Sequence, residues 1–265
     1  MLCSLGDLLL DVVVSSLAPG SWAHGSDTPS VTRVRAGGQA ANVAAWAVAL
    51  GGQARVVGQR AGDLAGELVA GDLARRGVGV AGPVGPGATG VVVAISEPGG
   101  ERTMLTDRGV CPQLAAGELR DEWFDGCDWL HLPVYSLVDA PIRAAALAAA
   151  RRVRRVSVDL SSVSVLREIG AAELASLLDT LAPEVIFGNE PECALVAPPP
   201  DITTLVTKLG AAGVRVNGKT WPARPAQPVD STGAGDAFAA GFLVGGVEWG
   251  LEAAARAVSQ LGAMP

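Results

Sequence analysis

The chain has 265 residues, enough for one large α/β domain or two small ones, and its 49% of hydrophobic residues indicates a globular protein. The net charge of -7 argues against a nucleic-acid scaffold, although a local phosphate site needs only a few donors. Four scattered cysteines and two histidines make a disulfide framework, a zinc site or histidine-based metal ligation unexpected. With no membrane-length apolar run and no secretory leader, the sequence favours a cytoplasmic protein without nucleic-acid or membrane partners.

The N-terminal residues predict two strands. Met1–Leu5 is short and apolar, and Leu8–Val14 is β-prone. Asp11 interrupts the second run, and two interpretations stay open for it: an edge or bulge position, or a hydroxyl acceptor at a pocket. After a polar loop, the alternation of Val31–Arg35 predicts a half-exposed strand.

Residues 37–80 alternate between helix and strand patterns. A small-residue helix is expected from Gly37-Gly38 to Leu50, then a strand at Arg55–Gly58. A helix at Asp63–Arg76, capped by Asp63, precedes a short strand at Val78–Val80. This βαβ order predicts a parallel sheet.

Two β-prone runs then interrupt the alternation. Thr89–Ser96 and Arg102–Thr106 flank turn residues and predict a hairpin. Together with the early strands they could form a small separate sheet, a candidate lid with strands from about 8–36 and 88–108 on a single domain spanning 1–265.

The alternation resumes in the second half of the chain. Strands are expected at Trp129–Leu132, Val156–Leu160, Glu184–Phe187 and Leu205–Leu209, helices at Ala140–Arg152, Ala171–Leu181 and Leu251–Leu261, and a hairpin at Val214–Trp221. Asp159 and Asn189 stand at carboxyl ends of strands. Ligands collect beyond these ends in open α/β sheets, so this edge is the expected site.

The most informative stretch is Asp230–Phe238, in which Gly233-Ala234-Gly235 opens an apolar helix. Backbone amides at a helix N-terminus, unobstructed by side chains, bind anions. Asp236 is unusual beside an anion site. Either it takes the proton of a hydroxyl that attacks a phosphoryl group, or it merely caps the helix.

Two further glycine-rich strings are rejected as nucleotide motifs. Gly213–Thr220 matches the P-loop pattern, but Trp221-Pro222 follows and cannot start a helix. Asn217-Gly218 favours a type I′ hairpin there. Gly77–Gly82 spells a dinucleotide fingerprint, but prolines follow and a strand and loop explain it better.

The pair Gly37–Ala44 and Asp230–Phe238 resembles the two signatures of the ribokinase-like (PfkB) family of carbohydrate kinases. Further similarities extend over nearly the whole chain, at Gly6-Asp7 with Asp11, Gly100–Thr103, Asn189–Glu192 and Lys208–Gly210. The resemblance implies a three-layer α/β/α body with a mostly parallel sheet and a β lid. It also implies transfer of the ATP γ-phosphate to a hydroxymethyl group of a ribose-like sugar or pseudouridine-like nucleoside.

The same resemblance implies roles for individual residues. Asp236 matches the catalytic base, and the anion hole matches Gly233, Ala234 and Gly235. The positions that bind the acceptor are Asp7, Asp11, Gly37, Gly38, Asn42 and Arg102. Asn189, Lys208 and Gly210 match nucleotide positions, and Glu192 would organise Mg²⁺ through water. ATP and Mg²⁺ are the implied cofactors, with a monovalent cation as a further candidate.

Two segments of the chain differ from the pattern of this family, and one predicted strand edge suggests an interface. Asp159–Ser162 lacks the common D-x-N-x-R pattern, and the segment between Leu209 and Asp230 is short and proline-rich. These departures motivate an alternative: a catalytically silent sugar- or nucleotide-binding regulator on the same fold. An NAD-dependent oxidoreductase, suggested by the fingerprint at Gly77–Gly82, is a third interpretation. An exposed lid edge such as Val31–Arg35 would invite pairing with a second copy, giving a homodimer.

Overall fold

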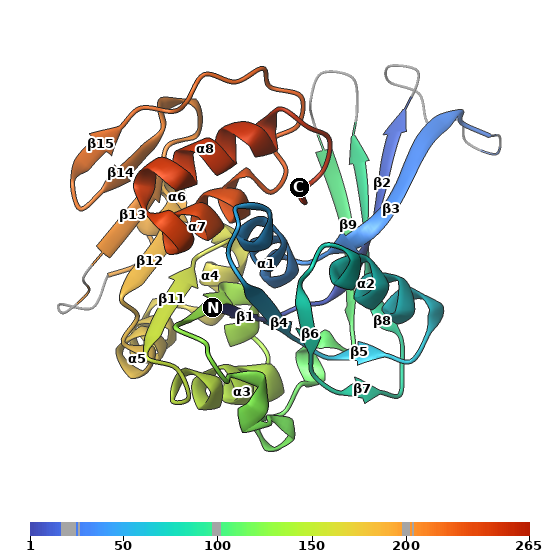
Figure 1. Cartoon of the computed structure of the whole chain (residues 1–265), viewed down its shortest axis with the longest axis horizontal. Helices are drawn as coiled ribbons and strands as arrows, with labels where there is room; N and C mark the ends of the chain where they lie inside the picture. Colours follow the sequence, from blue (N-terminus) through green and yellow to red (C-terminus); the bar gives the residue numbers. More distant parts are fainter. Residues whose placement is uncertain (17–24, 26, 97–101, 198–201, 203) are drawn as a thin grey trace.

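The computed structural model describes residues 1–16, 25, 27–96, 102–197, 202 and 204–265 (Figure 1). Its centre is a nine-stranded sheet in the order β15-β14-β13-β12-β11-β10-β1-β4-β6. The strands from β13 to β6 are parallel, and only β14 runs in the opposite direction, antiparallel to β13 and to β15. Their bounds are β1 Leu2–Leu5, β4 Ala54–Val57, β6 Gly79–Ala81, β10 Trp129–Pro133, β11 Arg155–Asp159, β12 Val185–Asn189, β13 Thr204–Lys208, β14 Val214–Val216 and β15 Lys219–Trp221.

Helices cover both faces of this sheet, which gives the three layers expected. One hydrophobic cluster joins the sheet to α1 (Gln39–Ala49), α2 (Leu64–Arg75), α7 (Ala234–Gly245) and α8 (Val247–Val258). The other face packs on α3 (Ala140–Ala150), α4 (Val163–Ile169) and α5 (Ala171–Leu181). Parallel strands bury both faces, in agreement with the almost continuous apolar runs in their sequences.

A second, four-stranded sheet stands beside α2 (Figure 1). It has the order β3-β2-β8-β9, with β2 Leu9–Ser16, β3 Ser30–Gly37, β8 Thr89–Ser96 and β9 Arg102–Gly109. The antiparallel pairing of β8 with β9 and the expected separate sheet are both confirmed, whereas the turn residues predicted between these strands, 97–100, lie outside the described residues. Asp11 lies on β2, an inner strand, so the edge interpretation of Asp11 is wrong.

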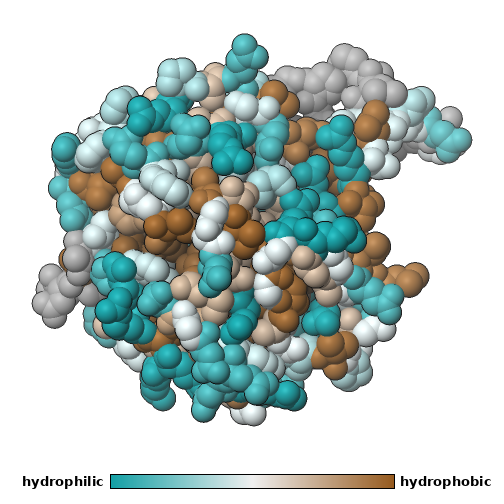
Figure 2. Space-filling view, in the orientation of Figure 1, coloured by the Kyte–Doolittle hydropathy of each residue, from teal (hydrophilic) through white to brown (hydrophobic). Residues whose placement is uncertain are grey.

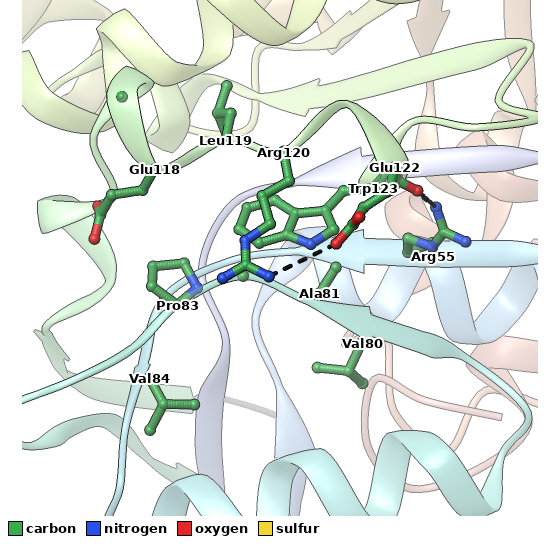
Figure 3. Close-up of a pocket in the computed structure, with 12 residues that line it drawn as sticks. Arg55, Val80, Ala81, Pro83, Val84, Glu118, Leu119, Arg120, Glu122 and Trp123 are labelled. Carbon is green, nitrogen blue, oxygen red and sulfur yellow. Dashed lines mark hydrogen bonds and ion pairs between the residues drawn. The ribbon is translucent and has the colours of Figure 1, made fainter.

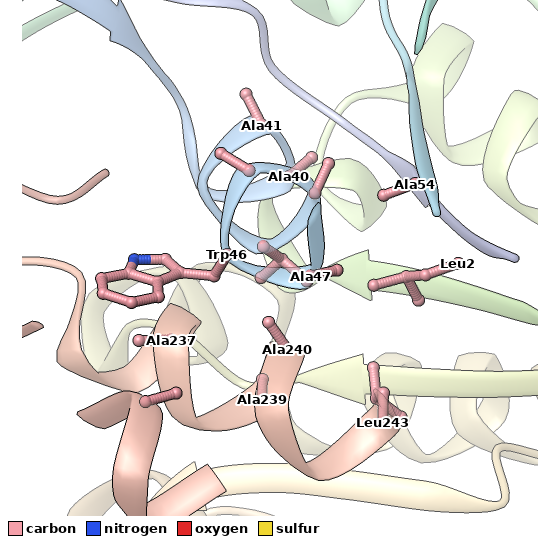
Figure 4. Packing of buried hydrophobic residues seen from close by; sticks show 14 of the residues in the cluster. Leu2, Ala40, Ala41, Trp46, Ala47, Ala54, Ala237, Ala239, Ala240 and Leu243 are labelled. Carbon is pink, nitrogen blue, oxygen red and sulfur yellow. The ribbon is translucent and has the colours of Figure 1, made fainter. Parts of the chain in front are cut away.

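Small residues bring α1 and α7 close together (Figure 4). Ala40, Ala44 and Ala47 on α1 and Ala237 and Ala240 on α7 are all fully buried. Alanine side chains let two helix backbones approach closely, and Trp46 fills the space at the side of the contact, where its Nε1 donates to the Ala263 carbonyl at 2.8 Å. This contact joins residues almost 200 positions apart in the sequence.

Most boundaries predicted from the sequence lie within a few residues of the observed ones, and the exceptions are short elements. Helix α4, the four-residue helix α6 (Glu190–Cys193) and a two-stranded ladder of β5 (Arg60–Ala61) and β7 (Val84–Gly85) were not expected. Single 3₁₀ turns at Cys111–Gln113, Ala116–Glu118, Asp121–Trp123, Val134–Leu137 and Gly210–Ala212 were also missed. The closing helix α8 begins and ends earlier than predicted.

The two rejected nucleotide motifs fold as expected. Asn217 and Gly218 adopt φ values of 46° and 85° between β14 and β15, as a type I′ turn requires. The Gly77–Gly82 string contains β6 and is followed by no helix. Within the described residues, no helix is both long enough and apolar enough to cross a membrane.

Candidate active site

The two separated sequence motifs meet at one hydrogen bond. The Asn42 Nδ2 atom, in the first turn of α1, donates to Oδ2 of Asp236, in the first turn of α7, at 2.8 Å. The Asn42 side chain is buried, whereas Asp236 is half-buried. The close α1–α7 packing described above positions this pair, so the carboxylate lies on the same side of the molecule as the N-terminal polar residues.

Asp236 is surrounded by features of an anion site. Gly233 is the N-cap of α7 in a left-handed conformation (φ 73°) and supplies no side-chain cap, so no capping side chain covers the positive end of the helix dipole. The Ala234 amide donates to the Ser231 carbonyl at 3.3 Å, so the amides of Gly235 and Asp236 are the better donors for an anion. Burial raises the pKa of Asp236 to about 7; the nearby Asp159 carboxylate adds to this effect, and the Asn42 hydrogen bond opposes it. A carboxylate with such a pKa can accept a proton near neutral pH.

The Gly37-Gly38 pair shapes the acceptor side. A side chain on Gly37 would meet the Asp11 carboxylate at 2.0 Å, and one on Gly38 would meet the Asp7 carbonyl oxygen at 2.2 Å. Gly38 also has a φ of 94°, which only glycine adopts readily. Asp11, whose pKa burial raises to about 6 against the opposing charge of Arg35, therefore lies against this turn.

Asp7 lies at the carboxyl end of β1 and is held by an arginine that the sequence did not reveal. Arg108, near the end of β9, donates through Nε and NH2 to the two Asp7 oxygens at 2.7 and 2.9 Å. The same guanidinium contacts Asp139 Oδ2 at 2.6 Å and the Tyr135 carbonyl at 2.9 Å. Burial still raises the pKa of Asp7, and Arg108 opposes that rise. Arg108 thus connects the end of β9, in the small sheet, to Asp7 in the candidate site.

The expected nucleotide residues gather at the carboxyl ends of β12 and β13. Asn189 and Glu192 form a reciprocal capping box: the Asn189 backbone amide donates to the Glu192 carboxylate at 2.8 Å, and the Glu192 backbone amide donates to Asn189 Oδ1 at 2.9 Å. The Asn189 Nδ2 atom also donates to Glu192, at 2.8 Å. Burial raises the pKa of Glu192, opposed by the Asn189 amide. Gly210 begins a 3₁₀ turn two residues after Lys208 and has open space on its side-chain face.

Lys208 is paired, which its sequence position did not indicate. Its Nζ lies 2.8 Å from Oδ2 of Asp159, which ends β11; β12 lies between this strand and β13. Burial by itself would lower the pKa of Lys208, but the carboxylates of Asp159, Glu192 and Asp236 together outweigh burial and the pKa is raised. Lys208 therefore remains a cation beside the anion site.

The sequence-predicted residues thus converge on one edge of the sheet, with one exception. Arg102 begins β9, but its side chain lies outside the described residues. Arg108, Asp139 and the partner role of Asp159 were missed, because a charged residue at a strand end has no local pattern that names its partner. A single arginine followed by glycine at the end of a β-prone run was the available signal for Arg108.

A surface groove of about 700 Å³ lies elsewhere and contains none of the predicted site residues (Figure 3). It runs beside β6, and its lining includes Arg55, Arg120 and Trp123. These side chains are occupied locally: Arg55 donates to the carbonyls of Glu122 and Trp123, and Arg120 lies over the Trp123 ring. The groove lacks the amides and carboxylates that converge at α7.

Comparisons with known proteins identify the family of the chain. The chain is 31% identical over 249 residues to the ATP-dependent ribose-1-phosphate kinase of Halopiger xanaduensis, covering 87% of this chain and 81% of that protein. It is 31% identical over 245 residues to a fructokinase of Klebsiella pneumoniae, covering 79% and 76%. The solved structure of adenosine kinase from Sinorhizobium meliloti superimposes with a TM-score of 0.84 at 24% identity, over 100% of this chain and 95% of that one. The pfkB family carbohydrate kinase profile matches residues 1–264, and the chain belongs to this family of kinases.

Proposed function

We propose that this kinase transfers the γ-phosphate of ATP to a primary hydroxyl of a small sugar or nucleoside, with Asp236 as general base. The observation that carries the proposal is the 2.8 Å hydrogen bond from Asn42 to Asp236. It orients the base at the N-terminus of α7, where Gly233, Ala234 and Gly235 form the anion hole. The transferring phosphoryl group would then meet the backbone amides while the attacking hydroxyl gives its proton to Asp236.

The nucleotide would bind along the ends of β12 and β13. Lys208 and Gly210 would line the path of the triphosphate to the anion hole, and Asn189 is the partner of Lys208 in the pairing of β12 with β13. Within the described part of the chain, no three His, Cys, Asp or Glu residues are grouped to hold a metal ion. Mg²⁺ that is carried by nucleotide phosphates keeps several waters and needs only one or two carboxylates, so Glu192, oriented by Asn189, fits an indirect role.

The acceptor would bind on the opposite side of Asp236. Asp7 and Asp11 can accept hydrogen bonds from sugar hydroxyls, Asn42 contributes its amide, and Gly37 and Gly38 let the acceptor approach the backbone. Arg102 on β9 is a further candidate contact. The small sheet would act as a lid that excludes water when both substrates are bound.

The acceptor is tested by a coupled assay of ADP formation with ATP and Mg²⁺ over a panel of ribose, fructose, ribose-1-phosphate, adenosine and pseudouridine. We expect acceptor-dependent ADP formation with at least one sugar or nucleoside, and product analysis should place the phosphate on a primary hydroxyl. No turnover with any member, together with ligand-induced shifts in melting temperature, would favour the silent binding regulator.

We also propose that two copies associate through the small sheet. Val31, Val34, Met104 and Leu105 on its outer strands β3 and β9 are each 45–57% exposed. Figure 2 shows hydrophobic side chains along the margin of the molecule where Figure 1 places the small sheet and α2. Exposed edge strands with apolar side chains are surfaces that a second copy can cover.

A further inference from the structure

The ion pair between Asp159 and Lys208 has an unusual location. Asp159 ends β11 and Lys208 ends β13, on either side of β12. Nζ lies 2.8 Å from one carboxylate oxygen and 3.1 Å from the other, so both oxygens hold the ammonium. The Asp159 side chain is fully buried and that of Lys208 is 19% exposed. The pair therefore has a single, well-defined geometry.

The ammonium lies against the first turn of α7. A Cβ built on Gly235 would be 3.2 Å from Nζ, so the lysine tip lies beside the backbone whose amides open the helix. The next residue is Asp236, and its pKa responds to both charges of the pair in opposite directions. The Lys208 ammonium and the positive N-terminal end of α7 thus lie side by side, next to Asp236.

The carboxylate that holds the lysine is itself fixed. The Ser161 amide donates to Asp159 Oδ1 at 2.9 Å, and Ser161 adopts a left-handed backbone with φ 57°. His131, on the neighbouring strand β10, is fully buried; burial lowers its pKa to about 4, so it adds no positive charge. Glu192 and Asp236 are the other acidic groups that raise the pKa of Lys208.

We propose that Asp159 is a positioning residue that holds the Lys208 ammonium at the mouth of α7 as the cationic component of the anion hole. The proposal rests on the proposed function of Asp236 and the α7 amides. Amides alone offer dipoles, whereas a fixed cation offers a full charge to the oxygens of the transferring phosphoryl group. A lysine without a partner would have to give up much of its rotamer freedom for each turnover. The ion pair removes that freedom in advance.

A purely structural ion pair is the competing explanation, because buried pairs often add little stability. The test compares Asp159→Asn, Lys208→Met and the double variant, with Glu184→Gln as the matched control. Arg155 begins β11, the strand that Asp159 ends, and its Nε and NH2 atoms donate to the Glu184 carboxylate at 2.8 and 2.5 Å. Melting temperatures show that each variant is folded.

We expect Asp159→Asn to lower kcat by about 100-fold, because small displacements of a catalytic group cost about that much, with little change in the acceptor KM. The double variant should be no slower than Lys208→Met. The acidic limb of the rate profile should move to lower pH in Asp159→Asn, since a negative charge near Asp236 is lost. A kcat for Asp159→Asn equal to that of Glu184→Gln, or effects of the two substitutions that multiply, would overturn the proposal.

If the single variant Asp159→Asn does not fold, a second measurement tests the same proposal. In Lys208→Ala, added ethylammonium should restore kcat saturably, because Asp159 offers it a binding site. That rescue should disappear in the charge-free variant Lys208→Ala/Asp159→Asn, whereas equal rescue in both, or none in either, contradicts the proposal. Asp236→Asn is assayed separately, so an error in the assigned base is distinguished from an error about the ion pair.

Discussion

At the scale of single residues, the ionisation of Asp236 decides whether a proton can be taken from the acceptor. Burial raises its pKa to about 7, so below that pH the carboxyl is protonated in the free enzyme and cannot act as a base. We expect kcat/KM for the acceptor to rise with pH through about 7 and then level off. A rate that stays constant between pH 5.5 and 8.5 would show that no group with this pKa acts in the step. Measuring at saturating Mg²⁺ keeps the nucleotide in one form.

Arg108 gives a second prediction at this scale. Arg108→Gln removes both hydrogen bonds to Asp7 and leaves a buried carboxylate without its charge partner. Breaking a buried ion pair in this way costs about 3 kcal/mol of unfolding free energy, and a protonated or displaced Asp7 should also raise the acceptor KM. The nucleotide KM should not change. Arg143→Gln, which removes an ion pair with Glu173 on α3 and α5, is the control. An Arg108→Gln enzyme with the stability and acceptor KM of this control would contradict the role.

Local chemistry explains which site residues the sequence could predict. Asp236 and its glycines form one short string, and the helix N-terminus that they create is a local property. Asn189 and Glu192 likewise form a capping box within four residues. Arg108 and Asp139 are 31 residues apart, and Lys208 and Asp159 are 49 apart, so only the fold brings these partners together.

At the scale of elements, the α1–α7 contact aligns the two motifs. Ala240→Leu adds three heavy atoms at a fully buried position of this contact. We expect it to lower the unfolding free energy by about 1–3 kcal/mol and to lower kcat, because separating the helices lengthens the Asn42–Asp236 hydrogen bond. Ala144→Leu, at an exposed position of α3, leaves both quantities unchanged. Denaturant unfolding and steady-state rates measure the two effects. A wild-type unfolding free energy and kcat for Ala240→Leu would contradict the tight packing of α1 on α7.

The elements themselves were predicted where the pattern was long and periodic. Helix α5 has the predicted bounds, Ala171–Leu181, because its apolar residues repeat at helical spacing. Helix α4 was missed because seven residues give too little periodicity, and its first residue follows the left-handed Ser161 turn closely. The order of the strands in the large sheet also depends on contacts that the sequence does not display.

At the scale of the whole molecule, the exposed apolar residues of the small sheet predict a homodimer. Val34→Glu and Leu105→Glu should each shift the mass measured by light scattering from dimer to monomer, since a buried charge opposes association. Val84→Glu is the control, because Val84 is 55% exposed and lies on β7, which pairs with β5 in a separate two-stranded sheet. A monomeric wild-type protein at high concentration contradicts the proposed association.

The activity of Asp236→Asn tests the central claim most directly. Asparagine has the same shape, can still accept the hydrogen bond from Asn42, and cannot take a proton. We predict a loss of kcat of at least about 100-fold, with nucleotide affinity by calorimetry unchanged and with Asp179→Asn, an exposed position on α5, as active as wild type. An Asp236→Asn enzyme that turns over at the wild-type rate would show that the carboxylate at the mouth of α7 is not the base.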